Sequence, residues 1–338
     1  LYLQQPAYGT SYVIGKLELD KLIAERRRQL GDRFTMRRFM DEFTAAGLVP
    51  MSLLPKQEYA AYTVRPKIHR LLDEYLQPVE PIRVKRKWNG EPARLGVISQ
   101  GAGGRKAALK RLDDFLENSL RRYARENREP SAHATSQLSS YLHFGHISSL
   151  EIALAVNEHA KQHKLIVPEF LEQLIVRREL AFNFAAHGPN PHTLAALPEW
   201  AQQTLAKHDR DKRDYVYTRK QFEQARTHDA LWNAMQHQLL HDGIIPGYQR
   251  MYWGKKIIEW SATHQDALDT MIYLNDRYAL DGRDPNTYTN ILWCFGLHDR
   301  PWTERPVFGM IRYMNLAGMQ RKTNVRAYID SQLTESLL

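Results

Sequence analysis

The stretch GYQRMYWGKKIIEW, residues 247–260, decides the fold class. Its apolar and aromatic residues recur with helical spacing, which predicts a helix from Tyr248 to Thr263. Trp253 and Trp260 are seven residues apart, so the helix would carry both indoles on one face, about 10 Å apart along its axis. We read outward from this helix in both directions.

Helical periodicity dominates residues 105–330, and strand patterns are almost absent there. No fixed-period repeat or low-complexity tract occurs. We therefore expect a mainly α structure, with one helical domain over 105–338. Its further helices are expected over Lys106 to Asn127, Ser149 to His163, Glu169 to His187, Asp229 to Asp242, Gln265 to Tyr278 and Thr303 to Leu316.

Two shorter zones precede this domain. Residues 55–104 read as a linker and entry segment, because a helical pattern at Lys67 to Leu76 runs into the Pro-, Gly- and charge-rich string QPVEPIRVKRKWNGEPARLG. Residues 1–54 read as a helical appendage, with helices expected at Ile14 to Leu30 and Met36 to Ala46 before a stop at Gly47.

The composition is that of an ordinary globular protein, with 43% hydrophobic and 25% charged residues in 338. The formal net charge of +9 favours a polyanionic partner such as nucleic acid. The single cysteine, Cys294, excludes an internal disulfide and fits a reducing cytoplasm. No apolar run of about 18 residues predicts a membrane span.

Two short motifs fail on inspection. The string GAGGRK (101–106) has Lys106 where a phosphate-binding loop needs glycine, so it indicates a flexible domain entry. His237 and His241 have the spacing of a zinc helix, but Gln238 stands where the general-base glutamate belongs. We expect no metal site.

Seven long segments, taken together, closely resemble class II cyclobutane pyrimidine dimer photolyases. They are KQEYAAYTVRPKIHRLLDEYL (56–76), TSQLSSYLHFGHIS (135–148), EQLIVRRELAFNF (172–184), THDALWNAMQHQLL (227–240), GYQRMYWGKKIIEW (247–260), YLNDRYALDGRDPN (273–286) and HDRPWTERPVFGMIRYMN (298–315).

The resemblance implies a helical FAD-binding domain of photolyase type whose N-terminal α/β antenna domain is missing. It implies a carbon-carbon lyase, a deoxyribodipyrimidine photo-lyase, that uses light and reduced FAD to split pyrimidine dimers in double-stranded DNA. The cofactor carries the chemistry, and the protein supplies binding and orientation. The lesion has to leave the duplex to reach it. We expect a cytoplasmic monomer that does not bind membranes.

Residues of the cofactor site follow from the matched motifs. The hydroxyl-rich string TSQLS precedes an apolar stretch and resembles the segment that holds the FAD phosphates, although such residues also serve as plain helix N-caps. Tyr123 resembles a tyrosine that contacts the flavin, and otherwise reads as a core residue. The residues of the string are Thr135, Ser136, Gln137, Leu138 and Ser139.

Arg250 and Asp281 match an ion pair beside the isoalloxazine ring, and the plain alternative is a surface pair. Asn275 resembles the residue that faces flavin N5, where an amide can donate or accept a hydrogen bond. The loop LDGRDPN contributes Gly282, Asp284 and Asn286 to the expected site, and otherwise reads as an ordinary turn.

Three tryptophans match an electron relay that reduces the flavin from the surface. They are Trp253 and Trp260, on the helix that opens this section, and Trp232, on the preceding helix. The alternative for any tryptophan is core packing.

The lesion pocket is expected around Trp293, Met251 and Tyr248, whose flat or soft surfaces can replace lost base stacking. Basic residues of the matched motifs would hold DNA phosphates without reading sequence, and the alternative is a solvated surface charge. These basic residues are Arg300, Arg312, Arg321 and Lys322.

One departure from the family falls in this pocket. Gln173 stands where the family has a glutamate that touches the dimer, and Glu172 or Glu179 is expected to compensate. Asn127 and Arg128 also stand in the reverse of the family's order, which leaves a lesion-side arginine open. A cryptochrome-like flavoprotein that binds FAD and DNA without repair is the alternative function.

Residues 1–54 differ from the rest of the chain. They resemble the C-terminal tail of a bacterial family of unknown function related to zinc metallopeptidases. The metal motif of that family is not in this stretch, so we expect no peptidase activity from it.

Overall fold

The computed structural model describes residues 28, 31, 53–78 and 103–335. Within these ranges the chain is built of helices, and its only β feature is an isolated bridge between Arg305 and Gly309. The predicted mainly α fold class is confirmed. The helices expected at Ile14 to Leu30 and Met36 to Ala46 fall almost entirely outside the described residues. No helix in the described ranges is long and apolar enough to cross a membrane.

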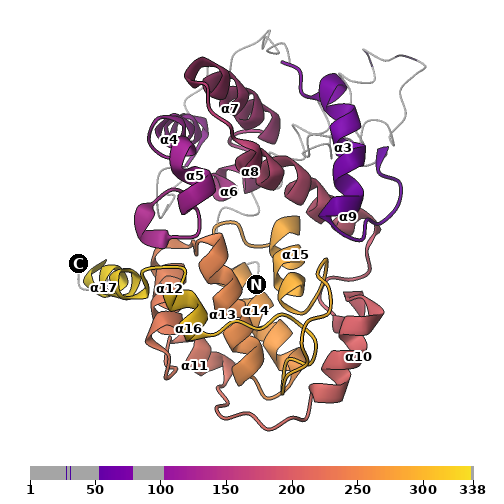
Figure 1. The fold of residues 1–338 in the computed structure, drawn as a ribbon, viewed down its shortest axis with the longest axis vertical. Helices are drawn as coiled ribbons and strands as arrows, with labels where there is room; N and C mark the ends of the chain where they lie inside the picture. The colour runs from indigo at the N-terminus through magenta and orange to yellow at the C-terminus, as the bar shows by residue number, and fades with distance from the viewer. Residues whose placement is uncertain (1–27, 29–30, 32–52, 79–102, 336–338) are drawn as a thin grey trace.

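A first group of helices forms the upper part of Figure 1 and shares one hydrophobic core. Leu54, Val64, Phe115, Ile152 and Ile175 are among its buried residues. The helices are α3 (Ala61–Tyr75), α4 (Arg105–Asn118), α5 (Leu120–Glu126), α6 (Ser139–His143), α7 (Ser149–His163), α8 (Pro168–Leu171), the π-helix η5 (Glu172–Arg177) and α9 (Arg178–His187), with the short 3-10 helix η4 (Pro130–Ala132).

A second group forms the lower part, and α9 connects the two because it also packs against α15. Its core includes Trp232, Trp253, Met271 and Phe308. The helices are α10 (Glu199–His208), α11 (Arg219–Glu223), α12 (Ala230–Asp242), α13 (Gly247–Trp260), α14 (His264–Tyr278), α15 (Pro285–Cys294), α16 (Leu316–Gln320) and α17 (Val325–Glu335), with the 3-10 helix η6 (Leu194–Ala196).

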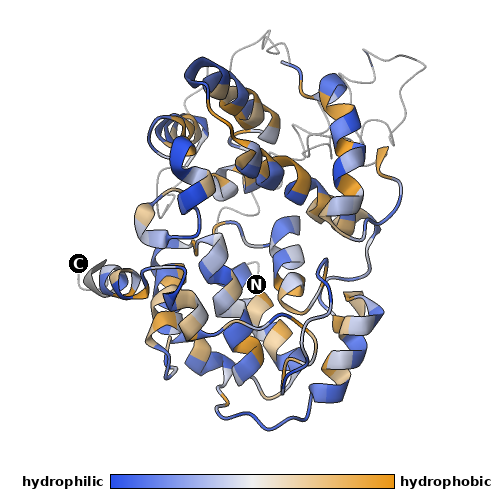
Figure 2. Ribbon diagram, viewed as in Figure 1, coloured by the Kyte–Doolittle hydropathy of each residue, from blue (hydrophilic) through white to orange (hydrophobic). Residues whose placement is uncertain are grey.

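Helix α13 lies inside this second group and contacts α12, α14 and α15. Nine of its fourteen residues are buried, among them the charged residues Lys255 and Lys256. The outer helices differ from α13, because hydrophilic and hydrophobic residues alternate around them (Figure 2). A helix buried on most sides holds its side chains in fixed positions, and α13 supplies several residues of the candidate site.

Two long predicted helices do not form as single regular α-helices. The helix expected over Lys106 to Asn127 breaks at Ser119, whose hydroxyl donates to the carbonyl of His133 and whose φ of −126° leaves the helical region. The helix expected over Glu169 to His187 is continuous but passes through the π-helix η5. Single π turns inside helices are often found at functional sites.

The helix predicted over Thr303 to Leu316 is wrong. This stretch is a loop, and α16 begins only at Leu316. Pro306 interrupts the helical hydrogen bonding, and Val307 and Gly309 have positive φ angles of 66° and 51°. The apolar residues of this loop are buried against α10 and α14 without being helical.

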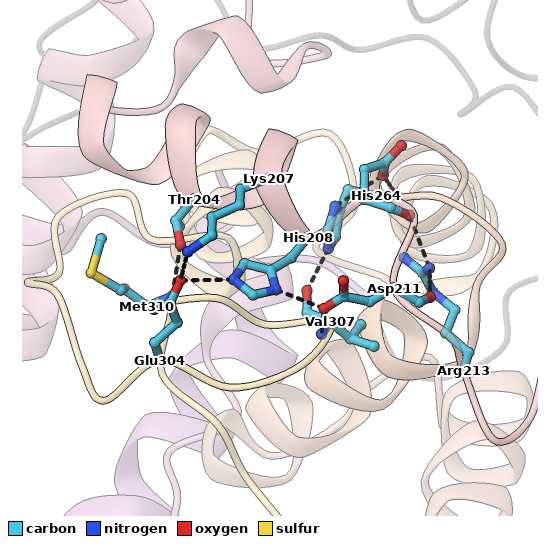
Figure 3. A network of polar contacts seen from close by, with 10 residues as sticks. Thr204, Lys207, His208, Asp211, Arg213, His264, Glu304, Val307 and Met310 are labelled. Carbon is cyan, nitrogen blue, oxygen red and sulfur yellow. Dashed lines mark hydrogen bonds and ion pairs between the residues drawn. The ribbon is translucent and has the colours of Figure 1, made fainter.

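A network of polar contacts fixes this loop to the end of α10 (Figure 3). His208 contacts Asp211 through Nδ1 at 2.6 Å and Glu304 through Nε2 at 2.9 Å. The N–H of Val307 donates to Asp211 at 2.8 Å, and the carbonyl of Val307 contacts Nε2 of His264 at 2.7 Å. Both backbone groups of the strained Val307 are therefore held.

Candidate functional site

The loop between α14 and α15 carries three of the predicted cofactor residues, Asp281, Gly282 and Asp284, and Asn286 follows in the first turn of α15. Asp284 caps α15, accepting from the backbone N–H of Asn286 at 2.9 Å and from its side-chain amide at 3.0 Å. Gly282 packs directly on the end of α14, because a Cβ atom there would lie 2.8 Å from the carbonyl oxygen of Asn275. The turn thus requires glycine at this position.

Arg250 from α13 and Asp281 from this loop form the predicted ion pair. Three guanidinium-to-carboxylate contacts of 3.3–3.5 Å join them. The two side chains keep only 18% and 13% of their surface exposed, so the pair is largely withdrawn from solvent. It is neither the surface pair of the plain alternative nor a fully buried one.

The string from Thr135 to Ser139 leads into α6 and is clamped from α4. The guanidinium of Arg111 donates to the carbonyl of Ser136 at 2.8 Å and to that of Thr135 at 3.4 Å. Gln137 has a φ of 54°, and Leu138 is buried at the N-cap of α6. Ser139, the first residue of the helix, is exposed.

A single contact joins this string to the loop of Asp284. Nδ1 of His143, on α6, lies 3.4 Å from the carboxylate of Asp284. Burial would raise the pKa of Asp284, but His143, the amide and N–H of Asn286 and the charge of Arg178 together lower it. The helix that begins at Ser139 therefore reaches the loop of Asp284, about 140 residues further along the chain, and the carboxylate at this contact is charged.

Two buried polar atoms near the Arg250–Asp281 pair lack hydrogen-bond partners among the described residues. Nδ2 of Asn275, whose side chain is 3% exposed, has no hydrogen-bond acceptor. Oε1 of Gln249, beside Arg250 on α13, has no donor, although the amide nitrogen of Gln249 donates to the carbonyl of Arg128 at 3.1 Å. Buried polar groups are normally satisfied, so such orphaned atoms fit a site that a polar ligand completes. The donor set suits a flavin, whose ring edge has both donors and acceptors.

Tyr123 lies apart from these residues in the first hydrophobic core. Its ring packs edge-on against Phe115 and Phe170, at centroid distances of 6.0 and 5.3 Å. Burial raises the pKa of its hydroxyl to about 12. These contacts are those of a core residue, and a flavin contact by Tyr123 stays a prediction.

The three predicted relay tryptophans form a continuous chain. Trp232 lies between the two indoles of α13, stacked on Trp253 at 6.3 Å and edge-on to Trp260 at 6.4 Å. Nε1 of Trp232 donates to the carbonyl of Trp253, and Nε1 of Trp253 donates to Gln236 at 2.9 Å. All three residues are at least 96% buried, so they are core residues and also contact one another.

Trp293 begins an alternating stack of cations and indoles. The ammonium of Lys255 lies 5.4 Å and the guanidinium of Arg312 lies 5.2 Å from the Trp293 ring. Arg312 also covers Trp302 at 4.3 Å, and Arg300 covers the same ring at 4.9 Å. The stack passes from a fully buried lysine to the exposed Arg300. Three of its five members were predicted for the lesion side.

Tyr248 and Lys322, also predicted for DNA binding, lie together, with the ammonium 5.7 Å from the ring. Met251 is half-buried on α13, and Arg321 is exposed after α16. No hydrogen bond, ion pair or ring contact in the described ranges links these four residues to the Trp293 stack, and their common role stays a prediction.

The acidic residues predicted to replace the family glutamate have other contacts. Glu172 forms a two-point ion pair with Arg65 of α3, at 2.7 and 3.0 Å, and this pairing lowers the pKa of its carboxyl. Glu179 is fully buried on α9 beside Arg178. Gln173 is exposed on η5. Glu172 therefore fixes α3 to η5 whatever its further role.

Four residues with notable geometry were not predicted as site residues. Gln249, His143, Lys255 and Trp302 all fall inside the matched segments, but each type is common in such positions. Only their three-dimensional contacts distinguish them from ordinary residues. Gln249 has an oxygen without a donor, and His143 has a carboxylate partner. Lys255 has a buried ammonium, and the ring of Trp302 lies between two guanidinium groups.

Comparisons with known proteins divide the chain as the sequence does. Residues 2–57 match the family model "Bacterial protein of unknown function (DUF885)". Over 81% of its length the chain is 43% identical to a deoxyribodipyrimidine photo-lyase of Oryza sativa subsp. japonica, and 42% identical to one of Methanothermobacter thermautotrophicus. Over 86% of its length it is 40% identical to one of Arabidopsis thaliana. It covers 59%, 64% and 64% of these relatives, respectively.

Two solved structures share the fold. A bacterial class III photolyase from Agrobacterium tumefaciens superposes with a TM-score of 0.55 at 20% identity, covering 69% of this chain and 45% of that one. A cryptochrome from Synechocystis sp. PCC6803 superposes with a TM-score of 0.62 at 15% identity, covering 86% and 62%.

The helical fold of the chain is thus the one that photolyases and cryptochromes share. The chain belongs to the photolyase/cryptochrome family. The resemblance predicted from the seven segments is confirmed at this level, as is the separate resemblance of the amino-terminal stretch. The chain spans about three fifths of the length of its curated relatives.

Proposed function

We propose that the chain binds FAD and repairs cyclobutane pyrimidine dimers in DNA with light, as a class II photolyase does. The observation that carries the proposal is the buried side-chain amide of Asn275, which lacks an acceptor, on a residue whose backbone carbonyl packs against the Gly282 turn. That turn also positions Asp281 for its ion pair with Arg250. The relatives named deoxyribodipyrimidine photo-lyase support the same reaction.

The residues of this chain would hold the cofactor from two sides. The hydroxyls and backbone N–H groups from Thr135 to Ser139 suit the pyrophosphate, and Arg111 keeps their carbonyls turned away from it. Arg250, Asp281 and Asn275 suit the flavin ring, where the ion pair supplies a fixed polar environment. When bound and reduced, FAD supplies the electron that splits the dimer.

The tryptophan chain is proposed to carry electrons toward the flavin from the far side of α13. Trp253, Trp232 and Trp260 are in ring contact one after the next, and hydrogen bonds within the core fix the indole N–H groups of Trp232 and Trp253. Fixed, closely packed rings change little in geometry between charge states. This arrangement favours transfer between them.

The DNA side is proposed to lie at the Trp293 stack. An indole held between two cations stays rigid and presents an edge or face to an extruded base. Arg300, at the exposed end, is suited to a phosphate or to the gap that a flipped lesion leaves in the duplex. The partner is therefore double-stranded DNA with a pyrimidine dimer.

The alternative function is a cryptochrome-like flavoprotein that binds FAD and DNA without repair. Two observations favour it: Gln173 replaces a charged residue, and Glu172 is occupied by Arg65. The remaining parts of the proposal are residues 105–338 as the catalytic domain, residues 1–54 as a separate appendage, and a cytoplasmic monomer. They rest on the sequence.

The test is to purify the chain, reduce its flavin chemically and follow dimer loss in an irradiated oligonucleotide under blue light, with a dark control. We expect light-dependent loss of dimers. If the chain binds reduced FAD but the dimers persist, the cryptochrome-like function replaces repair as the proposal. A chain that binds no FAD at all would refute both.

A further inference from the structure

A large open cavity is lined by residues of α12, α13, α17, the loop after α10 and the loop before α16. Its volume is about 1680 Å³, more than the roughly 300–1,000 Å³ of most small-molecule sites. None of the predicted FAD or lesion residues lines it. The wall includes Lys212, Arg213, Tyr215, His228, Trp260 and Arg305.

One part of the wall is aromatic. The ring of Tyr215 stacks on the imidazole of His228 at 3.8 Å and 18°, and His228 packs edge-on against Trp260 at 4.7 Å. The position of His228 is fixed, because its backbone N–H donates to the hydroxyl of Tyr217 at 3.0 Å and its ring Nδ1 contacts the same hydroxyl at 2.8 Å. Tyr215 is 48% exposed, so its outer face is available to a planar group.

Another part of the wall is basic, with Arg213, Lys212 and Arg305 among its residues. Arg213 donates through Nη1 to the carbonyls of Asp209 and Asp211, and its Nε and Nη2 are buried without a partner (Figure 3). Burial lowers the pKa of this guanidinium. Lys212 and Arg305 are exposed and have no carboxylate partner in the described part of the chain.

The carboxylates of the wall are mostly occupied. Asp211 contacts the ring of His208 and accepts a hydrogen bond from the N–H of Val307. Asp229 accepts from the hydroxyl of Tyr252 and the N–H of Trp232. Glu259 accepts from the ammonium of Lys256 and the hydroxyl of Tyr313. Asp214 is exposed and is the one lining carboxylate without a hydrogen bond or ion pair in the described ranges. Lys212 and Arg305 outnumber it, so the unpaired charge of the wall is positive on balance.

We infer that this cavity is a binding site for a small anion that carries an aromatic ring, of the nucleoside monophosphate class. The ring stacks on Tyr215 beside His228, and the phosphate accepts from Lys212 and Arg305, the two exposed cations of the wall. Charge-assisted hydrogen bonds from these cations favour a phosphate over a neutral group. This site is separate from the proposed flavin site and does not depend on it.

The test uses the chain saturated with FAD in the dark and measures binding of AMP by equilibrium dialysis, with adenosine as the neutral comparison. AMP should bind at one site and adenosine at least about tenfold more weakly, because the charged contacts are lost. Arg305→Ala and Tyr215→Ala, both on exposed side chains, should each weaken AMP binding about tenfold.

Arg326→Ala is the matched control, since Arg326 also lines the cavity but is paired with Asp330 at 2.9 Å. It should change AMP binding less than about twofold. The inference is overturned if AMP does not bind at millimolar concentration, or if it binds the Arg305 and Tyr215 variants as well as the parent. Failure of the chain to hold FAD would count against the proposed function only, because the variants locate AMP binding by themselves.

Discussion

Asn275 and Asn183 are both buried asparagines, but their hydrogen bonding differs. Asn183 accepts from the N–H of Glu58 at 2.7 Å and donates to the carbonyls of Leu54 and Lys56. The side-chain nitrogen of Asn275 has no acceptor. A protein retains an unsatisfied buried amide for a reason other than stability, and a ligand that completes it is the simplest reason.

The first prediction compares Asn→Leu at these two sites in flavin-free protein. Asn275→Leu should leave thermal stability unchanged or raise it by up to about 1 kcal/mol, because it removes a buried donor that has no partner. Asn183→Leu should cost roughly 3 kcal/mol or more, because it strands three backbone groups. Thermal unfolding measures both. A large loss at Asn275 would mean that its amide is satisfied within the protein.

His208 provides a second prediction at this scale. Both of its ring nitrogens contact carboxylates, and only the protonated ring can donate to both. Glu304 and Asp211 accordingly raise its pKa. The contact therefore stabilises the fold fully below the unfolded pKa of about 6.5, and this stabilisation is lost as the pH rises through the higher folded value.

Unfolding measured between pH 6 and 9 should show this loss in the parent and not in His208→Gln. His237→Gln is the control, because the side chain of His237 is exposed and has no carboxylate contact in the described ranges. It should keep the slope of the parent. Equal slopes in the parent and His208→Gln would show that His208 is not the charged residue of this network.

At the scale of elements, sequence periodicity located most helices of the second group but not their connections. Asp229 to Asp242 and Gln265 to Tyr278 agree with α12 and α14 to within one residue. The stretch from Thr303 to Leu316 also has apolar residues at helical spacing, but Pro306 and the positive φ at Val307 make it a loop. The polar contacts that hold this loop come from residues about 40 to 100 positions away, and periodicity cannot reveal them.

The turn between α14 and α15 gives a third prediction. Gly282→Ala should destabilise the protein by about 1–3 kcal/mol, because the new methyl group would meet the backbone oxygens of Asn275 and Ala279 at 2.8 and 2.9 Å. Gly247→Ala is the control, since nothing lies within 4 Å of a Cβ at the start of α13. It should be neutral or slightly stabilising. Denaturant unfolding that showed equal effects would contradict the close approach.

The tryptophan chain across α12 and α13 gives a fourth prediction. Trp253→Phe should slow photoreduction of oxidised flavin and leave repair by chemically reduced protein largely intact, because the two reactions use different partners of the flavin. Trp200→Phe, on α10, should affect neither. Flash absorption spectroscopy and a repair assay measure the two rates. Equal loss of both in Trp253→Phe would refute the relay.

For the whole molecule, the sequence predicted the family because long motifs keep their order. It could not predict which residues from elements far apart in the sequence meet. The contact between His143 and Asp284 and the stack that joins Lys255, Trp293 and Arg312 are examples. Each depends on how α6, α13, α15 and the loop before α16 pack, and sequence separation carries no such information.

The central claim is that the string from Thr135 to Ser139, the Arg250–Asp281 ion pair and Asn275 form one flavin site. Titration of the flavin-free chain with FAD, followed by the fine structure of its visible absorption band, tests this most directly. We expect one FAD per chain and at least about tenfold weaker binding in Arg250→Met, which leaves Asp281 without its partner. A chain that binds no FAD, or an Arg250→Met variant that binds it as tightly as the parent, would contradict the account.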